Sequence, residues 1–297
     1  MKIFEVGPRD GLQNEKKILK LEQKFKLVIS LLDAGLTDVE VGSFVKKTAI
    51  PQLAGTAELV KKILPLKKKR WPKARLWAFV PNEIGLENAL ASGVEGFSFF
   101  AATSETFARK NVNRSHKELK KHLKAMSLGV PRKARSRAYL STLVYCPFEG
   151  KISPSQVFRW VDYLLDIGIK DISLSDTTGH AHPSNLKKIF RELTKNYSPD
   201  NFSLHYHDTR GTALLNTYFA MEHGFTQFDS SLGGAGGCPY APGATGNLAT
   251  EDLLYLLQSQ SKLTNISLRK IAQASLELEK NLNKKLPSKI LQTLRTR

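Results

Sequence analysis

The chain has 297 residues, of which 41% are hydrophobic and 24% are charged, a composition typical of a soluble globular protein. It contains no run of about 18 apolar residues and only two cysteines, so neither a membrane span nor a disulfide framework is expected. The formal net charge is +18, because 45 Lys and Arg stand against 27 Asp and Glu.

Short strand-like runs alternate with longer amphipathic runs along most of the chain. The expected strands are Lys2–Val6, Asp38–Gly42, Arg75–Phe79, Gly96–Phe100, Arg137–Leu143, Asp171–Leu174, Phe202–Tyr206 and Gln227–Ser231. The expected helices, with apolar spacing near 3.6, are Glu22–Ala34, Thr56–Leu64, Gly85–Ser92, Ser115–Leu128, Pro154–Ile167, Asn185–Asn196 and Thr212–His223. Eight strands alternating with helices predict an α/β fold, a (β/α)8 TIM barrel.

The end of the chain is expected to add helices to this barrel. Thr250 is positioned to cap a helix through Glu251–Leu257, and residues 265–297 have the pattern of one or two further helices. We therefore expect a single domain over residues 1–297, with the barrel over about 1–260 and C-terminal helices over about 261–297. A doubly wound open sheet is the alternative, but the Gly7–Gly11 turn does not fit a dinucleotide-binding fingerprint.

The positive charge is concentrated in residues 61–75 and 109–137. Nucleic-acid binding, a solubilising surface and attraction of a polyanionic substrate would each account for it. Neither zone carries a nucleic-acid motif or interleaved aromatic residues, so no nucleic-acid partner is predicted. Strand-like sequence already begins at Lys2, which leaves no room for a signal peptide, and a cytoplasmic location is the default expectation.

Arg9 and Asp10 directly follow the first expected strand. Catalytic groups in such barrels lie at the carboxyl ends of the strands. This placement would set a cation that steadies anionic oxygen beside a carboxylate able to hold a metal. An isolated Arg-Asp pair is more often a surface ion pair that contributes little, so the interpretation depends on partners elsewhere in the chain.

Two later segments supply matching groups. The seventh expected strand ends in His205-Tyr206-His207, and strand alternation turns both histidines to one side and Tyr206 to the other. The eighth is followed by a glycine-rich loop that contains Cys238 and ends at Asn247. It lacks the lysine and the spacing of a P-loop, and we interpret it as a lid that brings Cys238 over a pocket.

Closure of the barrel would bring Asp10, His205, His207 and Asn247 together, because the eighth strand neighbours both the seventh and the first. One carboxylate, two imidazoles and one amide oxygen suit an octahedral divalent ion such as Mg²⁺ or Mn²⁺. A zinc site with Cys238 as a thiolate ligand is the rival interpretation, but no second cysteine stands near Cys238 in the sequence.

Taken together, these motifs resemble 3-hydroxy-3-methylglutaryl-CoA lyase, in the metal-dependent barrel superfamily that also holds the isopropylmalate and homocitrate synthases. The similarity extends through Glu40–Val45, Tyr145–Pro154 and Ser173–Gly179 and covers nearly the whole chain, as one pyruvate carboxyltransferase-like domain. The continuation Gly11–Glu15 after the Arg-Asp pair resembles the lyase rather than the synthases.

The resemblance implies retro-Claisen cleavage of 3-hydroxy-3-methylglutaryl-CoA to acetyl-CoA and acetoacetate by a homodimer. It implies a divalent cation on the residues Asp10, His205, His207 and Asn247. Arg9 would stabilise the enolate oxygen of acetyl-CoA, and Cys238 would protonate its carbanion.

The resemblance also assigns roles to residues around this centre. Glu40 and Asp176 match acidic residues of the family's active site, and Glu251 matches one near the metal. His205 is the first candidate for removing the C3-hydroxyl proton, with Asp176 as its rival. The expected substrate contacts are Arg9, Gln13 and Ser43.

Several positions depart from the family pattern: residues 46–51, Tyr145, Thr178, Tyr206 and Arg210. They leave the metal ligands intact but bear on the acyl group that is accepted. The alternatives are a lyase for a related 3-hydroxy-acyl-CoA, a condensing enzyme running in the opposite direction, or an inactive barrel that acts as a basic binding protein.

Overall fold

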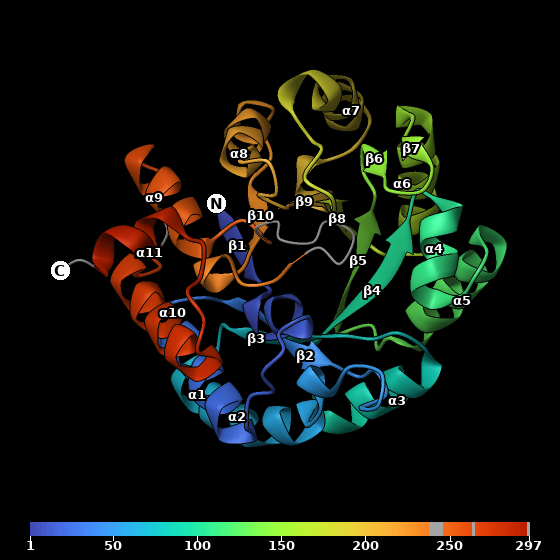
Figure 1. The fold of residues 1–297 in the computed structure, drawn as a ribbon. Coiled ribbons are helices and arrows are strands. Elements are labelled where there is room, and N and C mark those ends of the chain that lie inside the picture. The colour runs from blue at the N-terminus through green and yellow to red at the C-terminus, as the bar shows by residue number, and fades with distance from the viewer. Residues whose placement is uncertain (238–245, 263–264, 296–297) are drawn as a thin grey trace.

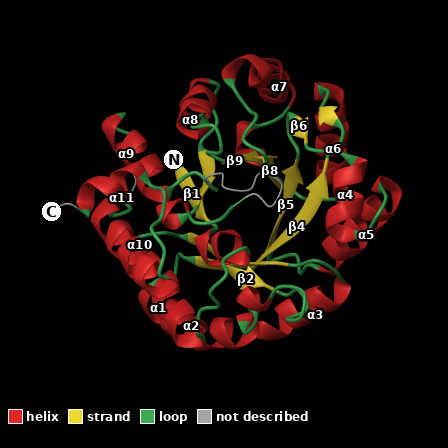
Figure 2. Ribbon diagram, viewed as in Figure 1, coloured by secondary structure: helices red, strands yellow, loops and turns green. Residues whose placement is uncertain are grey.

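The computed structural model describes residues 1–237, 246–262 and 265–295. Eight parallel strands close into a barrel in the order β1-β10-β9-β8-β5-β4-β3-β2, and helices surround it (Figures 1 and 2). The strands are β1 Lys2–Glu5, β2 Asp38–Ser43, β3 Arg75–Phe79, β4 Gly96–Ala102, β5 Arg135–Ser141, β8 Asp171–Asp176, β9 Phe202–Tyr206 and β10 Gln227–Ser230. The predicted TIM barrel is confirmed.

The helices cover the outside of the barrel, and those at the C-terminal end of the chain lie in the same outer ring (Figure 2). They are α1 Leu21–Asp33, α2 Thr56–Arg70, α3 Glu83–Ser92, α4 Glu105–Val112, α5 His116–Gly129, α6 Pro154–Asp166, α7 Pro183–Asn196, α8 Ala213–Glu222, α9 Thr250–Ser259, α10 Leu268–Leu282 and α11 Lys289–Leu294. The last two confirm the helices expected after residue 265, and α10 packs on α1 and α9. Among the described residues, no helix is long and apolar enough to cross a membrane.

Each outer helix buries one apolar stripe against the strands. In α6 the buried residues are Val157, Trp160, Val161 and Leu164, a spacing of three and four residues that places them on one face. Burial of one such side chain contributes about 1.5–3 kcal/mol relative to exposure. The barrel interior holds a hydrophobic cluster of its own, made of Phe4, Val6, Trp77 and Tyr139. The barrel is therefore filled by side chains, and the site can lie only at its rim.

Three local predictions need correction or completion. The fifth strand ends at Ser141 rather than at residue 143, because Thr142 has a φ of 60° and leaves the extended conformation. Thr250 does not cap α9, because the N-cap is Ala249 and the Thr250 hydroxyl donates to Glu5 Oε2 at 2.7 Å. Helix α4 and the β6–β7 hairpin, Tyr145–Cys146 with Gly150–Lys151, were not predicted because both are short.

Candidate active site

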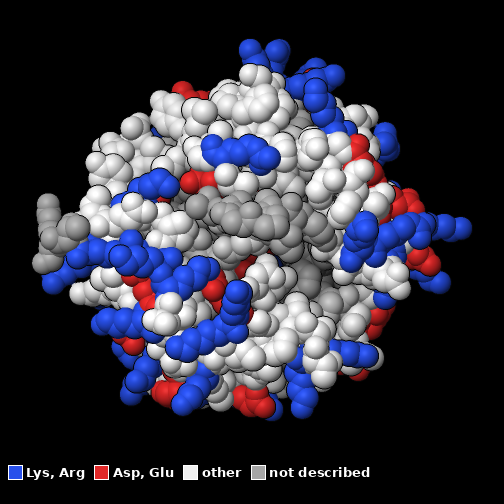
Figure 3. Space-filling model, viewed as in Figure 1, with Lys and Arg blue, Asp and Glu red and all other residues white. Residues whose placement is uncertain are grey.

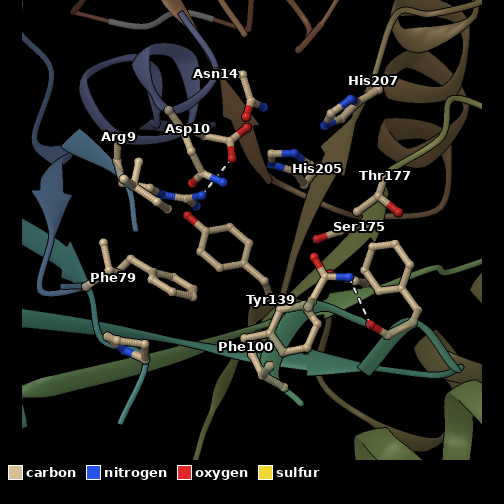
Figure 4. A pocket seen from close by; sticks show the side chains of 18 of the residues that line it. Arg9, Asp10, Asn14, Phe79, Phe100, Tyr139, Ser175, Thr177, His205 and His207 are labelled. Carbon is tan, nitrogen blue, oxygen red and sulfur yellow. Dashed lines mark hydrogen bonds and ion pairs between the residues drawn. The ribbon is translucent and has the colours of Figure 1, made fainter. Parts of the chain in front are cut away.

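The Arg9-Asp10 pair lies in a tight turn at the carboxyl end of β1. A single π-helical turn, Gly7–Gly11, follows the strand, and the backbone N–H groups of Arg9, Asp10 and Gly11 all approach the carbonyl of Val6 at 2.7–3.3 Å. This turn directs the two charged side chains toward the mouth of the barrel (Figure 4). Their predicted position at a strand end is therefore the observed one.

Arg9 is buried, and neighbouring side chains contact its guanidinium group from several sides. Its Nε donates to Glu40 Oε2, its Nη1 donates to Asp10 Oδ1 at 2.6 Å, and its guanidinium carbon lies 4.8 and 5.2 Å from the ring centres of Tyr139 and Phe79. Burial alone would lower the pKa of Arg9, but the carboxylates of Glu40 and Asp10 more than offset it, so the pKa is raised. Nη2 has no hydrogen-bond partner among the described residues and remains for a ligand oxygen.

Asp10, His205 and His207 form a cluster of metal-ligating groups. One ligand atom from each lies within 4.8 Å of the others, and the two imidazole rings come from one face at the end of β9, as strand alternation predicts. Burial would raise the pKa of Asp10, but Arg9 and the two histidines lower it to about 2. Burial, followed by the neighbouring His205, lowers the pKa of His207 to about 4. Both side chains therefore present free electron pairs near neutral pH.

Asn247 joins this cluster because the chain after the glycine-rich loop returns beside β9. His207 and Asn247 form an antiparallel bridge, and Asp208 N donates to Gly246 O at 2.9 Å. Asn247 Nδ2 donates to Asp10 Oδ2 at 2.8 Å, while its Oδ1 is buried without a partner in the part of the chain described. Gly236 is needed opposite: its φ is +116°, and a Cβ there would lie 2.6 Å from Asn247 Nδ2.

A buried ion pair lies directly below His205. Asp229 on β10 accepts two hydrogen bonds from Arg137 Nη2, at 2.9 and 3.2 Å, and its Oδ2 lies 3.3 Å from His205 Nδ1. Burial would raise the pKa of Asp229, but Arg137 lowers it. The carboxylate thus favours a proton on Nδ1 and leaves Nε2 of His205 as the free ligand atom. Neither charged residue was predicted, although each is an ionisable side chain inside an expected strand.

The residues above open onto a cavity of about 250 Å³ (Figure 4). Arg9, Asp10, His205 and His207 form one side, and Gln13, Asn14, Ser175 and Thr177 add neutral polar groups. Phe79, Phe100, Phe107 and Val112 supply an apolar side. The cavity thus offers charged groups at its inner end and apolar surface along its wall.

Some expected site residues lie elsewhere. Asp176 does not line this cavity: it lies beside Tyr206 in register, and its carboxylate accepts from the backbone N–H groups of His180 and Ala181 at 3.0 and 2.8 Å. Burial raises its pKa to about 6. Ser43 is not among the lining residues either; it pairs with the cavity-lining Phe79 across β2 and β3, and its hydroxyl accepts from Val45 N at 3.2 Å. Strand alternation turns Ser175 and Thr177 into the cavity and Asp176 away from it. The catalytic role of Asp176 and the substrate contact of Ser43 stay predictions.

Glu40 and Glu251 lie behind residues that surround the cavity and do not line it themselves. Glu40 is fully buried beneath Arg9 and also accepts a hydrogen bond from Tyr139 Oη at 2.9 Å. Glu251 accepts from Gly233 N at 2.7 Å and from the Ser275 hydroxyl, and so holds the start of the glycine-rich loop rather than a metal ligand. Cys238 lies outside the described residues.

A closed barrel with an arginine, a carboxylate and two histidines at the ends of its strands defines a TIM-barrel enzyme with a candidate metal centre. The family model described as HMGL-like matches residues 1–277. The chain belongs to this family.

Individual relatives agree with this assignment. Hydroxymethylglutaryl-CoA lyase YngG of Bacillus subtilis (strain 168) is 41% identical over 99% of this chain and 97% of its own length. The crystal structure of the Bacillus subtilis HMG-CoA lyase has a TM-score of 0.95 and covers 99% of this chain and 97% of that one, at 41% identity. The HMG-CoA lyase of Acinetobacter baumannii, solved with coenzyme A and 3-methylmalate, has a TM-score of 0.92 at 34% identity and covers 98% and 94% of the two chains.

Proposed function

We propose that this enzyme cleaves 3-hydroxy-3-methylglutaryl-CoA to acetyl-CoA and acetoacetate with the help of Mg²⁺ or Mn²⁺. The observation that carries the proposal is the convergence of Asp10, His205 and His207 beside the buried guanidinium of Arg9. Membership of the HMGL-like family and the full-length similarity to hydroxymethylglutaryl-CoA lyases support the substrate.

The residues present fit a hard divalent cation. Asp10 offers a carboxylate oxygen, His205 and His207 one nitrogen each, and Asn247 the amide Oδ1 that is otherwise buried without a partner. A buried polar atom left without a partner costs about 1–3 kcal/mol, which a metal–oxygen bond would remove. When bound, the cation would polarise the substrate's hydroxyl and carboxylate oxygens and lower the pKa of the hydroxyl group.

The reaction breaks the bond between C2 and C3 of the acyl chain. The C3-hydroxyl proton leaves, its electron pair forms the new ketone of acetoacetate, and the C2–C3 pair becomes the enolate of the acetyl thioester. Arg9 Nη2 faces the cavity with a permanent charge and can hold the enolate oxygen. The rings of Phe79 and Tyr139 and the carboxylate of Glu40 prevent Arg9 from swinging away.

The enolate carbon must then receive a proton. We propose Cys238 for this step, as the resemblance implies; a thiol near its usual pKa of about 8.5 remains protonated at neutral pH. Replacing it by serine should slow turnover and leave metal binding unchanged. Unchanged turnover in Cys238→Ser would remove Cys238 from the mechanism.

His205 was expected both to bind the metal and to take the hydroxyl proton. Its Nδ1 faces Asp229, so only Nε2 remains, and one nitrogen cannot hold a metal and accept a proton at the same time. We propose the metal role, because three ligand atoms meet at this point. A His205→Ala variant that binds Mn²⁺ as tightly as the unmodified enzyme but has lost turnover would assign His205 to the proton instead.

One assay tests the proposed reaction as a whole. Purified protein is mixed with the methylglutaryl thioester and Mg²⁺ or Mn²⁺, and acetoacetate is measured with and without a chelator. Cleavage that needs the metal is the expected result. Absence of cleavage, or cleavage indifferent to the chelator, overturns the proposal. Faster cleavage of a thioester that lacks the 3-methyl group would favour the related 3-hydroxy-acyl-CoA lyase. The homodimer and the cytoplasmic location stay predictions.

A further inference from the structure

A second cavity lies on the other side of the loop that follows β8. It has a volume of about 550 Å³ and lies between the β6–β7 hairpin and the first turn of α7, two segments on the same side of the barrel in Figure 1. Among the described residues it shares no lining residue with the candidate active site: Thr177 lines the first cavity and His180 the second. Its size lies within the range of pockets that hold small organic molecules.

The permanently charged side chains that line this cavity are cations. Lys151 and Arg210 line it together with the imidazoles of His180 and His182, and none of the described lining residues is acidic. Burial, followed by the neighbouring Arg210, lowers the pKa of His180, as expected for an imidazole removed from water beside a cation. Such a cluster favours an anion, and the arginine fork fits a phosphate or carboxylate.

The same cavity also has an aromatic wall. The rings of Tyr145 and His180 are stacked, with centres 4.0 Å apart and planes 20° from parallel. His180 Nδ1 lies 2.8 Å from the Thr178 hydroxyl, and Arg210 Nη1 donates to Thr178 O at 2.7 Å, so the cation and the stacked rings are fixed relative to each other. Val144 and Ile152 add apolar surface. Stacked rings beside cationic groups accommodate a planar group that carries an anion.

We propose that this cavity binds a phosphate monoester with a planar aromatic group, of the size of a mononucleotide, as a ligand separate from the acyl-CoA substrate. The phosphate would lie against Lys151 and Arg210, and the planar group would lie along the Tyr145–His180 stack.

The test uses the full-length, metal-loaded protein and AMP as the probe, with binding measured by calorimetry. AMP is expected to bind more tightly than either adenosine or inorganic phosphate alone, because the cavity offers both an aromatic wall and cations. Lys151→Gln and Arg210→Gln should each weaken AMP binding about tenfold, as expected for the loss of one hydrogen bond to a charged group. The matched control is Lys170→Gln, an exposed lysine outside the cavity, which should leave AMP binding unchanged.

Competition experiments distinguish the two sources of such a nucleotide. If AMP binds without competing with the acyl-CoA, and Lys151→Gln leaves the KM for the thioester unchanged, the separate site is supported. If coenzyme A displaces AMP and Lys151→Gln raises that KM, the cavity holds the nucleotide end of the substrate, and the separate ligand is overturned. Absence of AMP binding at millimolar concentration, with cleavage activity intact, overturns the site without touching the proposed reaction.

Discussion

Arg137 is the charged residue whose replacement should disturb the barrel interior most. Its side chain is fully buried, it pairs with Asp229 at 2.9 Å, and its guanidinium carbon lies 3.7 Å from the ring centre of Phe4. Arg137→Met keeps an apolar stem of similar length but removes the charge. The carboxylate of Asp229 would then remain buried without its main counter-ion.

The expected cost follows from this burial. Removing one partner of a buried ion pair destabilises a protein by about 3–5 kcal/mol. At roughly 2–4 °C per kcal/mol for a large domain, the melting temperature should fall by about 6–20 °C. The double variant Arg137→Met/Asp229→Asn should recover most of this loss, because it removes the unpaired charge as well. Urea unfolding followed by circular dichroism measures the four free energies of the cycle.

Metal binding separates the second role of Asp229 from its pairing with Arg137. Asp229→Asn weakens the contact that orients His205 Nδ1, so Mn²⁺ affinity measured by calorimetry should fall about 10–100-fold, in the single and the double variant alike. Arg159→Met, on the exposed face of α6, is the control and should change stability by less than about 0.5 kcal/mol. An Arg137→Met variant within about 1 kcal/mol of the unmodified protein, or a double variant no more stable than the single one, refutes the reasoning.

Three further predictions concern the site and the loop beside it. Arg9→Gln should lower kcat by at least about 10²–10³-fold, because it removes a fixed donor to the enolate, with the circular dichroism spectrum unchanged; near-normal turnover would exclude this role. Mn²⁺ at 100 times its Kd should raise the free energy of unfolding by about 2.7 kcal/mol, and this gain should vanish in His207→Ala or with chelator; an equal gain in the variant would place the metal elsewhere. Burial raises the pKa of Glu251 from 4.5 to about 7, so between these values the folded state binds more protons than the unfolded state and stability falls as pH rises, by up to about 3 kcal/mol. Glu251→Gln should flatten this slope in urea titrations at several pH values, and an unchanged slope would show that Glu251 does not titrate there.

Much of the fold could be predicted because its periodicities are local. Strand runs of alternating or continuous apolar residues, separated by helical spacing and glycine stops, are set by side-chain geometry within a few residues. The same local rule placed His205 and His207 on one side and Tyr206 on the other, and placed Arg9 and Asp10 at a strand end. Short elements such as α4 carry too few residues for a pattern to emerge.

The support beneath the site could not be predicted in the same way. Arg137, Asp229 and His205 come from β5, β10 and β9, and their contacts depend on which inward side chains share one layer of the closed barrel. Asp176 falls within a motif of the resemblance, yet the register of its strand pairs it with Tyr206, so its side chain is turned away from the cavity.

The amino-acid sequence by itself therefore determined the barrel and the set of groups at its mouth, because alternation and strand ends are short-range properties of the chain. The tertiary structure alone decided which carboxylate orients His205 and which cations and rings enclose the second cavity. Those contacts join segments tens of residues apart, and only barrel closure, strand register and loop packing bring them within hydrogen-bonding distance.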